Sequence, residues 1–283
     1  MQGEARAPAA GTVLNALATG TGAAFAIDEY VHASVELGGR GDVEGTVTGQ
    51  PGADTRLVER CVRLASEEYG DGSGGQVTTE SDVPMASGLK SSSAAANAAV
   101  LATVAALGVE DEVERVDAAR LGVRAARDVG VTVTGAFDDA SASMLGGVTV
   151  TDNERDDLLQ RDEVGWDVLV WTPPEQAFSA DADVDRCRRI AAIADLVADL
   201  ALNGDYGRAM TVNGLAFCAA LEFPTDPIVE ALPAAQGASL SGTGPSFTAV
   251  GDRDALESVA EQWRARPGET WLTTTQSAGA TVL

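Results

Sequence analysis

Lysine and histidine are almost absent from this sequence. Its 283 residues include 19 basic residues, of which one is a lysine, Lys90, and there is a single histidine, His32. One histidine argues against a histidine-based catalytic triad and against a histidine metal site. A P-loop is excluded, because that motif requires a glycine directly before its lysine and Leu89 stands there. The Rossmann fingerprint also fails, since Gly20 and Gly22 begin a G-x-G that lacks the third glycine or alanine and precedes a strand.

Cysteine is also scarce, and long apolar runs are missing. The three cysteines, Cys61, Cys187 and Cys218, are odd in number and far apart, which fits neither a disulfide framework nor a zinc site. No apolar run reaches the ~18–20 residues that a membrane-spanning helix needs. The first residues show no charged segment followed by an apolar one, as a secretory signal would. We therefore expect a cytoplasmic protein that does not enter the membrane.

Negative charge, in contrast, is abundant: 43 acidic residues against 19 basic ones give a formal net charge of -24. Nucleic acids and anionic membranes are polyanions, so neither is an expected partner, and we expect a small-molecule substrate instead. A solvated acidic surface explains the charge, as in proteins of salt-loving cells, where high salt screens the self-repulsion. The pattern makes no prediction of the oligomeric state. Hydrophobic residues make up 45% of the chain, enough to build a core, so wholesale disorder is excluded.

Helical and strand patterns are mixed in both halves of the chain, which predicts an α+β fold. The charged segment 153–163 is the best linker candidate, so we expect domains at 1–154 and 155–283. The clearest helix is predicted over residues 91–107, which are small and almost wholly apolar and should be buried. Further helices are predicted over 54–69, 111–128, 184–203, 206–221 and 253–264, with a shorter one after Pro227. Strands are predicted over 23–28, 31–37, 45–48, 75–79, 145–151, 166–171, 238–240, 247–250 and 270–274.

The strongest chemical signal is the segment P-M-A-S-G-L-K-S-S-S-A-A-A at residues 84–96, where a glycine, serines and the only lysine precede the buried helix. Free N–H groups at a helix N-terminus attract anions, serine hydroxyls donate to phosphate or bind Mg²⁺, and Gly88 permits close backbone approach. We predict a phosphate-binding loop; a serine-capped helix after a tight turn is the alternative. The residues assigned to the loop are Met85, Ala86, Ser87, Gly88, Leu89, Lys90, Ser91, Ser92, Ser93 and Ala94.

The pattern P-x-x-x-G-L-x-S-S-x-A in this loop resembles the central ATP-phosphate motif of the galactokinase, homoserine kinase, mevalonate kinase and phosphomevalonate kinase superfamily. Residues 10–15, A-G-T-V-L-N, resemble the first motif, on the substrate side, which implies Thr12 and Asn15 as substrate residues. The third motif is a glycine-rich turn beside the phosphate loop, matched here by Ser241, Gly242, Thr243 and Gly244. The resemblance covers essentially the full chain. It implies a ribosomal-S5-like N-terminal domain followed by a ferredoxin-like C-terminal domain.

Three finer segments, G-L-K-S-S-S-A, T-G-A-F-D-D-A and N-A-L-A-T-G-T-G-A-A-F, are similar to the archaeal type of shikimate kinase within that superfamily. That family is unrelated to the P-loop shikimate kinases, in agreement with the missing P-loop. The resemblance implies ATP-dependent phosphorylation of a shikimate hydroxyl in aromatic amino-acid biosynthesis, with ATP and Mg²⁺ as cofactors. Two alternatives remain open: another kinase of the superfamily, acting on homoserine or a mevalonate-type alcohol, and a non-catalytic ligand-binding relative.

Two adjacent acids, Asp138 and Asp139, stand in the turn G-A-F-D-D-A. In mevalonate kinase-like members an aspartate of the matching turn accepts the substrate hydroxyl proton, which implies Asp138 as the base; a positioned carboxylate can orient the hydroxyl and take its proton. The alternative is that these acids cap the following helix, the role we expect for Asp139. The family's first-motif lysine is replaced here by Thr12. Either no lysine is needed there, or Lys90 reaches across to neutralise the transferring phosphate.

For Mg²⁺, the resemblance implies the second serine of the loop, Ser92, and a carboxylate upstream of the base, a position that Asp128 matches. An acid at the C-terminal end of a helix opposes the helix dipole, which weakly supports a functional role. In the first motif region, Asn15 and Thr19 are polar among small residues, and hydrogen bonds that close a loop would explain them equally well. A carboxylate substrate favours an arginine, and Arg6 is the nearest one in the sequence.

Overall fold

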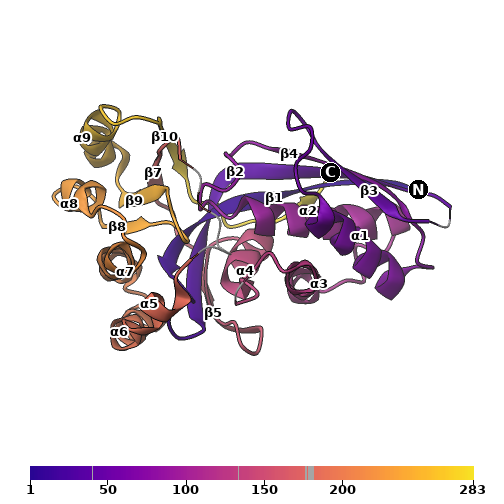
Figure 1. The fold of residues 1–283 in the computed structure, drawn as a ribbon, viewed down its shortest axis with the longest axis horizontal. Coiled ribbons are helices and arrows are strands. Elements are labelled where there is room, and N and C mark those ends of the chain that lie inside the picture. The colour runs from indigo at the N-terminus through magenta and orange to yellow at the C-terminus, as the bar shows by residue number, and fades with distance from the viewer. Residues whose placement is uncertain (40, 133, 176, 178–181) are drawn as a thin grey trace.

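The computed structural model describes residues 1–39, 41–132, 134–175, 177 and 182–283. Helices and strands are mixed along this part of the chain, which confirms the predicted α+β class. Figure 1 shows a long sheet with helices packed against it in one half, and a smaller sheet with its own helices at the other end. Within the described ranges, no helix is long and apolar enough to cross a membrane.

The larger sheet has the strand order β11-β1-β2-β4-β3, with β5 paired to β2 and β6 paired to β5. β3 and β4 are parallel, and the other pairs are antiparallel. The strands are β1 Gln2–Leu14, β2 Thr21–Leu37, β3 Val43–Val47, β4 Gly75–Ser81, β5 Val148–Asp152, β6 Asp157–Asp162 and β11 Thr281–Val282. The helices of this half are α1 Arg56–Tyr69, α2 Ser91–Leu107, α3 Arg115–Val129 and α4 Phe137–Leu145.

The central helix α2 packs directly on β1 and β2. It has no polar face, because its residues are nearly all small and apolar, and most of them are buried. Alanines face it from the sheet, among them Ala5 and Ala7, and side chains this small let helix and strand backbones approach closely. α2 begins at Ser91 and ends at Leu107, as the sequence predicted. The packing fixes the N-terminus of α2 relative to the sheet, and with it the preceding loop.

The smaller sheet is antiparallel, with the order β10-β7-β9-β8. Its strands are β7 Asp167–Thr172, β8 Gly237–Leu240, β9 Phe247–Gly251 and β10 Glu269–Thr274. The helices of this half are α5 Val184–Arg188, α6 Ala191–Leu202, α7 Tyr206–Leu221, α8 Asp226–Ala231 and α9 Arg253–Trp263. The single helix predicted over 184–203 is therefore two helices, α5 and α6, separated by a break between Arg188 and Ala191.

The polar segment 153–163 is not a linker, which corrects the sequence-based prediction. Residues Asp157–Asp162 form β6, which pairs with β5 as a hairpin of the larger sheet. Side chains of β6 alternate between exposed and half-buried, so a strand on the edge of the sheet looks polar in sequence. The boundary predicted at residue 154 falls inside the turn of this hairpin, and the chain passes from one sheet to the other between β6 and β7.

The two halves share part of their core. The ends of β1 and β2 that contribute Val13, Leu14 and Phe25 pack in one apolar cluster with Ala194 of α6 and Met210 of α7. This seam also brings the turn at 241–244, from the second half, against the loop before α2. The three predicted motifs thus meet in space although they are far apart in sequence.

Candidate active site

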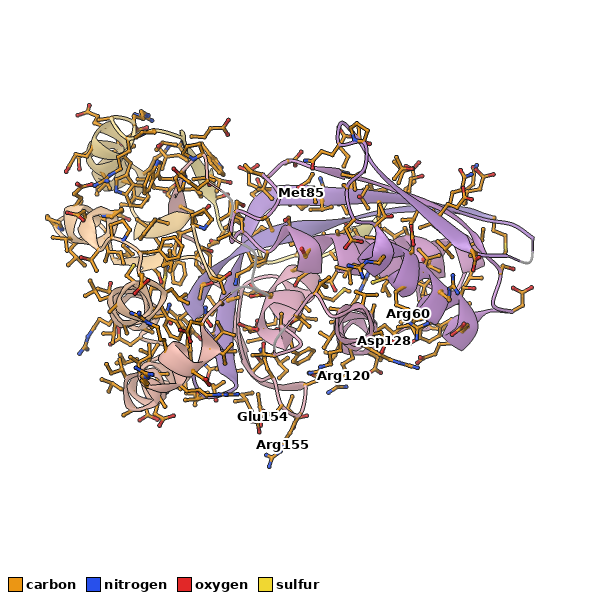
Figure 2. The ribbon with its side chains drawn as sticks, viewed as in Figure 1. Arg60, Met85, Arg120, Asp128, Glu154 and Arg155 are labelled. Atoms are coloured by element: carbon orange, nitrogen blue, oxygen red, sulfur yellow. The ribbon has the colours of Figure 1, made fainter. Side chains whose placement is uncertain are left out.

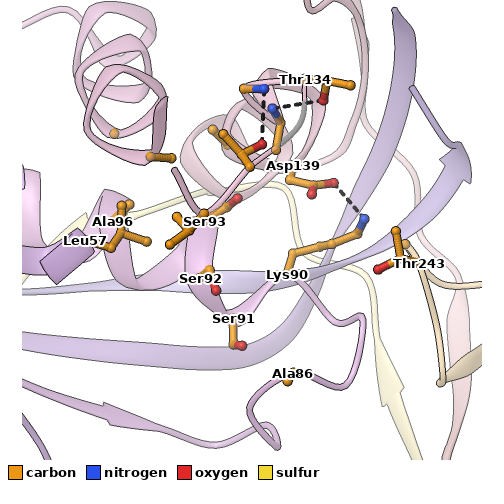
Figure 3. Close-up of a pocket in the computed structure, with 18 of the residues that line it drawn as sticks. Leu57, Ala86, Lys90, Ser91, Ser92, Ser93, Ala96, Thr134, Asp139 and Thr243 are labelled. Carbon is orange, nitrogen blue, oxygen red and sulfur yellow. Dashed lines mark hydrogen bonds and ion pairs between the residues drawn. The ribbon is translucent and has the colours of Figure 1, made fainter. Parts of the chain in front are cut away.

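A cavity of about 740 Å³ lies where the three motifs meet. At one end the lining comes from α1, α2 and α3 and includes the apolar residues Leu57, Ala96 and Val123, with the charged Arg56 at the start of α1. The other end is polar and charged. The residues that line this polar end include Asn15, Lys90, Ser91, Ser92, Ser93, Asp138, Asp139, Gly242 and Thr243. Figure 3 shows the serines at the start of α2, with Lys90, Asp139 and Thr243 beyond them. A cavity of this size suits a small-molecule ligand.

The N-terminus of α2 faces this cavity without a side-chain cap. Its N-cap residue is Lys90, in the left-handed conformation with φ 64, and no side chain makes a capping hydrogen bond there. The serine-capped alternative is therefore not what this helix uses. Uncapped N–H groups and the helix dipole leave an anion-binding position, and Ser91, Ser92 and Ser93 add hydroxyls to the same wall.

The predicted phosphate loop divides into residues that face the cavity and residues that hold the loop. Met85, Ala86, Gly88 and Lys90 to Ser93 line the cavity. Leu89 and Ala94 are fully buried. The carbonyl oxygen of Leu89 accepts a hydrogen bond from the N–H of Ala10 at 3.1 Å, and that of Ser87 accepts one from the N–H of Ser246 at 3.1 Å. β1 of the first half and the residue directly before β9 of the second half thus anchor the loop.

The glycine-rich turn packs directly on the phosphate loop. The Ser241 hydroxyl donates to the carbonyl oxygen of Gly88 at 2.9 Å. Thr12 accepts the N–H of Gly242 at its Oγ1, at 2.7 Å, and Asn15 donates from Nδ2 to the carbonyl oxygen of Gly242 at 2.8 Å. Asn15 also lines the cavity, whereas Thr12 does not. Backbone hydrogen bonds of the kind considered for Asn15 are therefore present, and Thr12 acts on the site through the turn.

Gly88→Ala is expected to destabilise the fold and weaken nucleotide binding. Gly88 has φ +85, and a Cβ there would lie 2.3 Å from the carbonyl oxygen of Ser241, so loop and turn would have to separate. Strain of this kind lowers the free energy of unfolding by about 1–3 kcal/mol. The resulting fall in Tm can be measured by differential scanning calorimetry. Gly130→Ala is the matched control, because Gly130 also has positive φ but no atom within 4 Å of its Cβ position. An equal fall in Tm for both variants would show that backbone conformation alone is responsible.

Asp138 lies in the first turn of α4 and is only 5% exposed. Asn153 donates a hydrogen bond from Nδ2 to its Oδ1 at 2.7 Å. The pKa of Asp138 is raised to about 7, first by burial and then by the charge of Asp139, while Lys90 and the Asn153 hydrogen bond partly offset the rise. A carboxylic acid with a pKa near neutrality, at the wall of a cavity, is suited to general acid–base chemistry.

Asp139 does not cap α4, contrary to the prediction. The N-cap residue of α4 is Ala136, and no side chain makes a capping hydrogen bond. The Asp139 carboxylate forms an ion pair with Lys90 instead, with Nζ 2.8 Å from Oδ1, and both side chains are largely buried, at 9% and 15% exposure for Lys90 and Asp139 (Figure 3). The only lysine in the chain is thereby held between the phosphate loop and the two acids.

Asp128 and Arg6 are not brought to the cavity. Asp128 forms an ion pair with Arg60 of α1 at 2.6 Å, on the outer surface of α1 and α3, as Figure 2 shows. Neither Asp128 nor Arg6 is among the described residues that line the cavity. Arg6 lies over the ring of Tyr30, 4.3 Å from its centroid. Thr19 also lies outside the lining, with its hydroxyl oxygen buried and without a hydrogen-bond partner.

Asn153 and Gly22 are site residues that the sequence did not reveal. Asn153 is fully buried beside Asp138. A Cβ at Gly22 of β2 would lie 2.5 Å from Oδ2 of Asp138, so the strand backbone packs on the carboxylate. Asn153 belongs to no motif, and Gly22 stands in the segment N-A-L-A-T-G-T-G-A-A-F, where nothing linked it to Asp138. Both reach the site through the pairing of β2 and β5.

Comparison with known proteins identifies the family. Residues 56–147 match the model of the GHMP kinases N-terminal domain. Over 281 residues the chain is 67% identical to a shikimate kinase of Halobacterium salinarum, with 99% of each chain covered. The chain belongs to the shikimate kinase family. A shikimate kinase of Methanothrix thermoacetophila is 53% identical over 273 residues, which are 95% of this chain and 92% of that protein. The resemblance inferred from the three motifs is confirmed.

Solved structures place this shikimate kinase family member in the expected superfamily fold. A homoserine kinase from Cytophaga hutchinsonii matches with a TM-score of 0.78 and 19% identity, covering 100% of this chain and 97% of that one. The mevalonate kinase of Methanococcus jannaschii matches with a TM-score of 0.74 and 13% identity, covering 98% of both chains. These likenesses support the predicted domain types, a ribosomal-S5-like and a ferredoxin-like part. The family consists of ATP-dependent small-molecule kinases.

Proposed function

We propose that the protein transfers the γ-phosphoryl group of ATP to a hydroxyl of shikimate, giving shikimate 3-phosphate, in the cytoplasm. The observation that carries the proposal is that the uncapped N-terminus of α2, Lys90 and the buried carboxylate of Asp138 face one cavity. Phosphoryl transfer needs little covalent chemistry from the protein. It needs an anion site, a positive charge near the γ-phosphate and a group that orients the attacking hydroxyl.

The nucleotide would lie along the length of the cavity. At the end formed by α1, α2 and α3, the side chains of Leu57, Ala96, Val123 and Val131 offer an apolar surface for the adenine ring. The phosphates would lie on the first turn of α2, where backbone N–H groups and the hydroxyls of the serines can donate to their oxygens. This orientation directs the γ-phosphate towards Asp138 and Lys90.

The shikimate hydroxyl would bind at the charged end of the cavity. Asp138 accepts a hydrogen bond from the hydroxyl, which aligns the attacking oxygen with the γ-phosphorus, and takes its proton as the new P–O bond forms. Asn15 and Thr243 line the same end and are the residues we propose to contact the substrate. Thr12 shapes this end indirectly, through its hydrogen bond to Gly242.

Lys90 is proposed to stabilise the negative charge that develops on the transferred group. Its ion pair with Asp139 fixes the position of the ammonium group. A charge that is already in place in a largely buried site does not have to be reoriented during the reaction. Mg²⁺ fits the oxygen donors of this wall, because Ser92 is an exposed hydroxyl in the first turn of α2. Ser92 and the phosphate oxygens would hold the ion, which supplies further neutralisation of the phosphate charge. Asp128 is engaged by Arg60 instead.

The rate is expected to depend on the ionisation of Asp138. The pKa of this carboxyl is raised from 3.8 to about 7, so below that pH the proton acceptor is blocked and kcat/KM should fall about tenfold per pH unit, with a plateau above it.

The stability of the folded protein should change with pH in the opposite sense. Between pH 4 and 7 the folded protein keeps a proton that the unfolded chain has lost, so the free energy of unfolding decreases as pH rises. Rate profiles and urea unfolding at constant ionic strength measure both; an acidic limb near pH 4 would contradict the prediction.

A product assay tests the substrate. We expect ATP-dependent formation of shikimate 3-phosphate, detected by ³¹P NMR and by coupled release of ADP, with shikimate as acceptor and with homoserine and mevalonate as competitors in separate reactions. Turnover of homoserine or mevalonate without turnover of shikimate would assign a different kinase activity. Absence of nucleotide binding would favour a non-catalytic relative.

A further inference from the structure

Asn153 stands in the turn between β5 and β6 and has no exposed surface. Its side chain makes two hydrogen bonds to one residue of the site. Nδ2 donates to Oδ1 of Asp138 at 2.7 Å, and Oδ1 of Asn153 accepts the backbone N–H of Asp138 at 3.1 Å. The Thr151 hydroxyl donates to the same Asn153 oxygen at 2.7 Å. A polar side chain buried this completely and bonded this closely to Asp138 constrains both the backbone and the carboxylate of that residue.

These contacts fix which way the Asn153 amide points. A backbone N–H can only donate, so the atom that faces the N–H of Asp138 must be the amide oxygen. The amide nitrogen then faces Oδ1 of Asp138 and must donate to it. Oδ1 is engaged by Asn153 in this way, whereas Oδ2 makes no hydrogen bond with Asn153 and is the oxygen that we assign to the substrate hydroxyl. Gly22 leaves room for the Asp138 side chain itself, because a Cβ at Gly22 would lie 2.5 Å from Oδ2.

The backbone of Asn153 is held as firmly as its side chain. Its N–H donates to the carbonyl oxygen of Gly20 at 2.9 Å, and its own carbonyl oxygen accepts a hydrogen bond from Nη2 of Arg127 at 3.1 Å. Arg127 in turn forms a two-pronged ion pair with Asp156, at 2.6 and 2.8 Å. Helix α3 and the β5–β6 turn therefore set the position of Asn153, and no group in this chain of contacts needs to touch the substrate.

We propose that Asn153 is a positioning residue, which holds Oδ1 of Asp138 and reserves Oδ2 for the proton of the substrate hydroxyl. The inference rests on the proposed function, since it presumes that Asp138 is the base. A hydrogen bond donated to a carboxylate favours its ionised form and restricts its rotamer, and a catalytic base held by a third group is a recurrent arrangement. Asn153 thus favours the ionised form of the base and keeps it aligned.

The charged groups that face Asp138 come from the elements packed around it. Lys90 lies at the N-terminus of α2 and Asp139 is its neighbour on α4. Arg127 of α3 reaches the site through the carbonyl oxygen of Asn153, and β2 presents the backbone of Gly22. A pH profile of kcat/KM therefore reports the ionisation of Asp138 among these neighbours. A substitution of Asn153 changes one of its hydrogen bonds and leaves the charged neighbours in place.

Asn153→Asp is the informative substitution. The new side chain has nearly the same shape and keeps an acceptor for the Asp138 N–H and the Thr151 hydroxyl, but the donor to Oδ1 is replaced by a second carboxylate. We expect kcat to fall at least about tenfold at pH 7, the acidic limb of the profile to move up by about one pH unit, and KM for ATP to stay within about twofold. Thr151→Val is the control: it removes another hydrogen bond from the same amide and leaves the donor to Asp138, so the limb should not move.

The result can be separated from stability and from the proposed function. Should Asn153→Asp fail to fold, as judged by circular dichroism, NMR of the ¹⁵N-labelled wild-type protein decides: the Asn153 side-chain amide should titrate with the midpoint of the kcat/KM profile, and a pH-independent signal overturns the inference. The positioning role alone would be overturned if Asn153→Asp folds and keeps the wild-type kcat and the wild-type acidic limb of the pH–rate profile, while Asp138→Asn is inactive. An active Asp138→Asn would overturn the proposed role of Asp138 and this inference with it.

Discussion

Asp138→Asn is expected to reduce kcat by about 10²–10⁴-fold while the protein still binds nucleotide, because a positioned general base contributes a factor of that size. Asparagine keeps the shape of the side chain but cannot accept the hydroxyl proton. The uncapped N-terminus of α2 and its serines are unchanged by this substitution. Isothermal titration with ADP should therefore give a wild-type Kd, while the coupled assay shows almost no turnover.

Asp128→Asn is the matched control for this experiment. It makes the same chemical change in a carboxylate that is bound to Arg60 outside the cavity, so kcat should remain within about twofold, as is usual for surface positions. Retention of full activity in Asp138→Asn would refute the assigned base and would favour a non-catalytic or differently organised site. A comparable loss in Asp128→Asn would instead restore Asp128 as a functional carboxylate.

Lys90→Met is expected to reduce kcat by about 10²–10³-fold, the range found when one preorganised electrostatic contact to a transition state is removed. Methionine retains the length and apolar stem of the side chain but carries no charge. Loss of the ammonium also removes an influence that lowers the pKa of Asp138, so the acidic limb of the rate profile should move to higher pH. Stopped-flow measurements of a single turnover, made across pH, separate the two effects.

The ion pair with Asp139 complicates this result, and a second variant resolves it. Lys90→Met leaves the largely buried Asp139 carboxylate without its partner, which costs stability by itself. The double variant Lys90→Met with Asp139→Asn removes that cost. Activity that returns in the double variant would mean that Lys90 only neutralises Asp139. Activity that stays low assigns Lys90 to the transferring phosphate.

The sequence predicted best where local pattern and tertiary structure agree. Helix α2 was predicted with its full extent, because its residues are uniformly small and apolar and Gly108 ends it in a left-handed conformation. β1 was missed because it is rich in alanine and glycine, and because its second half is buried on both faces and shows no alternation. β6 was missed for the opposite reason, since a polar strand at a sheet edge resembles a linker.

Within the site, local motifs were sufficient for Lys90 and the serines but not for their surroundings. Asp128 and Arg127 are adjacent on α3, yet successive residues of a helix point about 100° apart. Arg127 consequently points to the base through Asn153, and Asp128 points outwards to Arg60. Asn153 lies beyond a helix and a strand from Asp138, and only the pairing of β5 in the sheet brings them together. Orientation on a helix and register across a sheet are properties of the whole fold.

The apolar cluster at the seam has a thermodynamic consequence. Because Val13, Leu14 and Phe25 pack with side chains of α6 and α7, unfolding of the second half would expose the ends of the central strands of the first half. We therefore expect unfolding of one half to destabilise the other. A nucleotide that binds only the native state stabilises that state as a whole. We therefore expect nucleotide bound at the phosphate loop to slow hydrogen exchange of the backbone amides in α6 and α7. Neither helix contributes a described residue to the cavity.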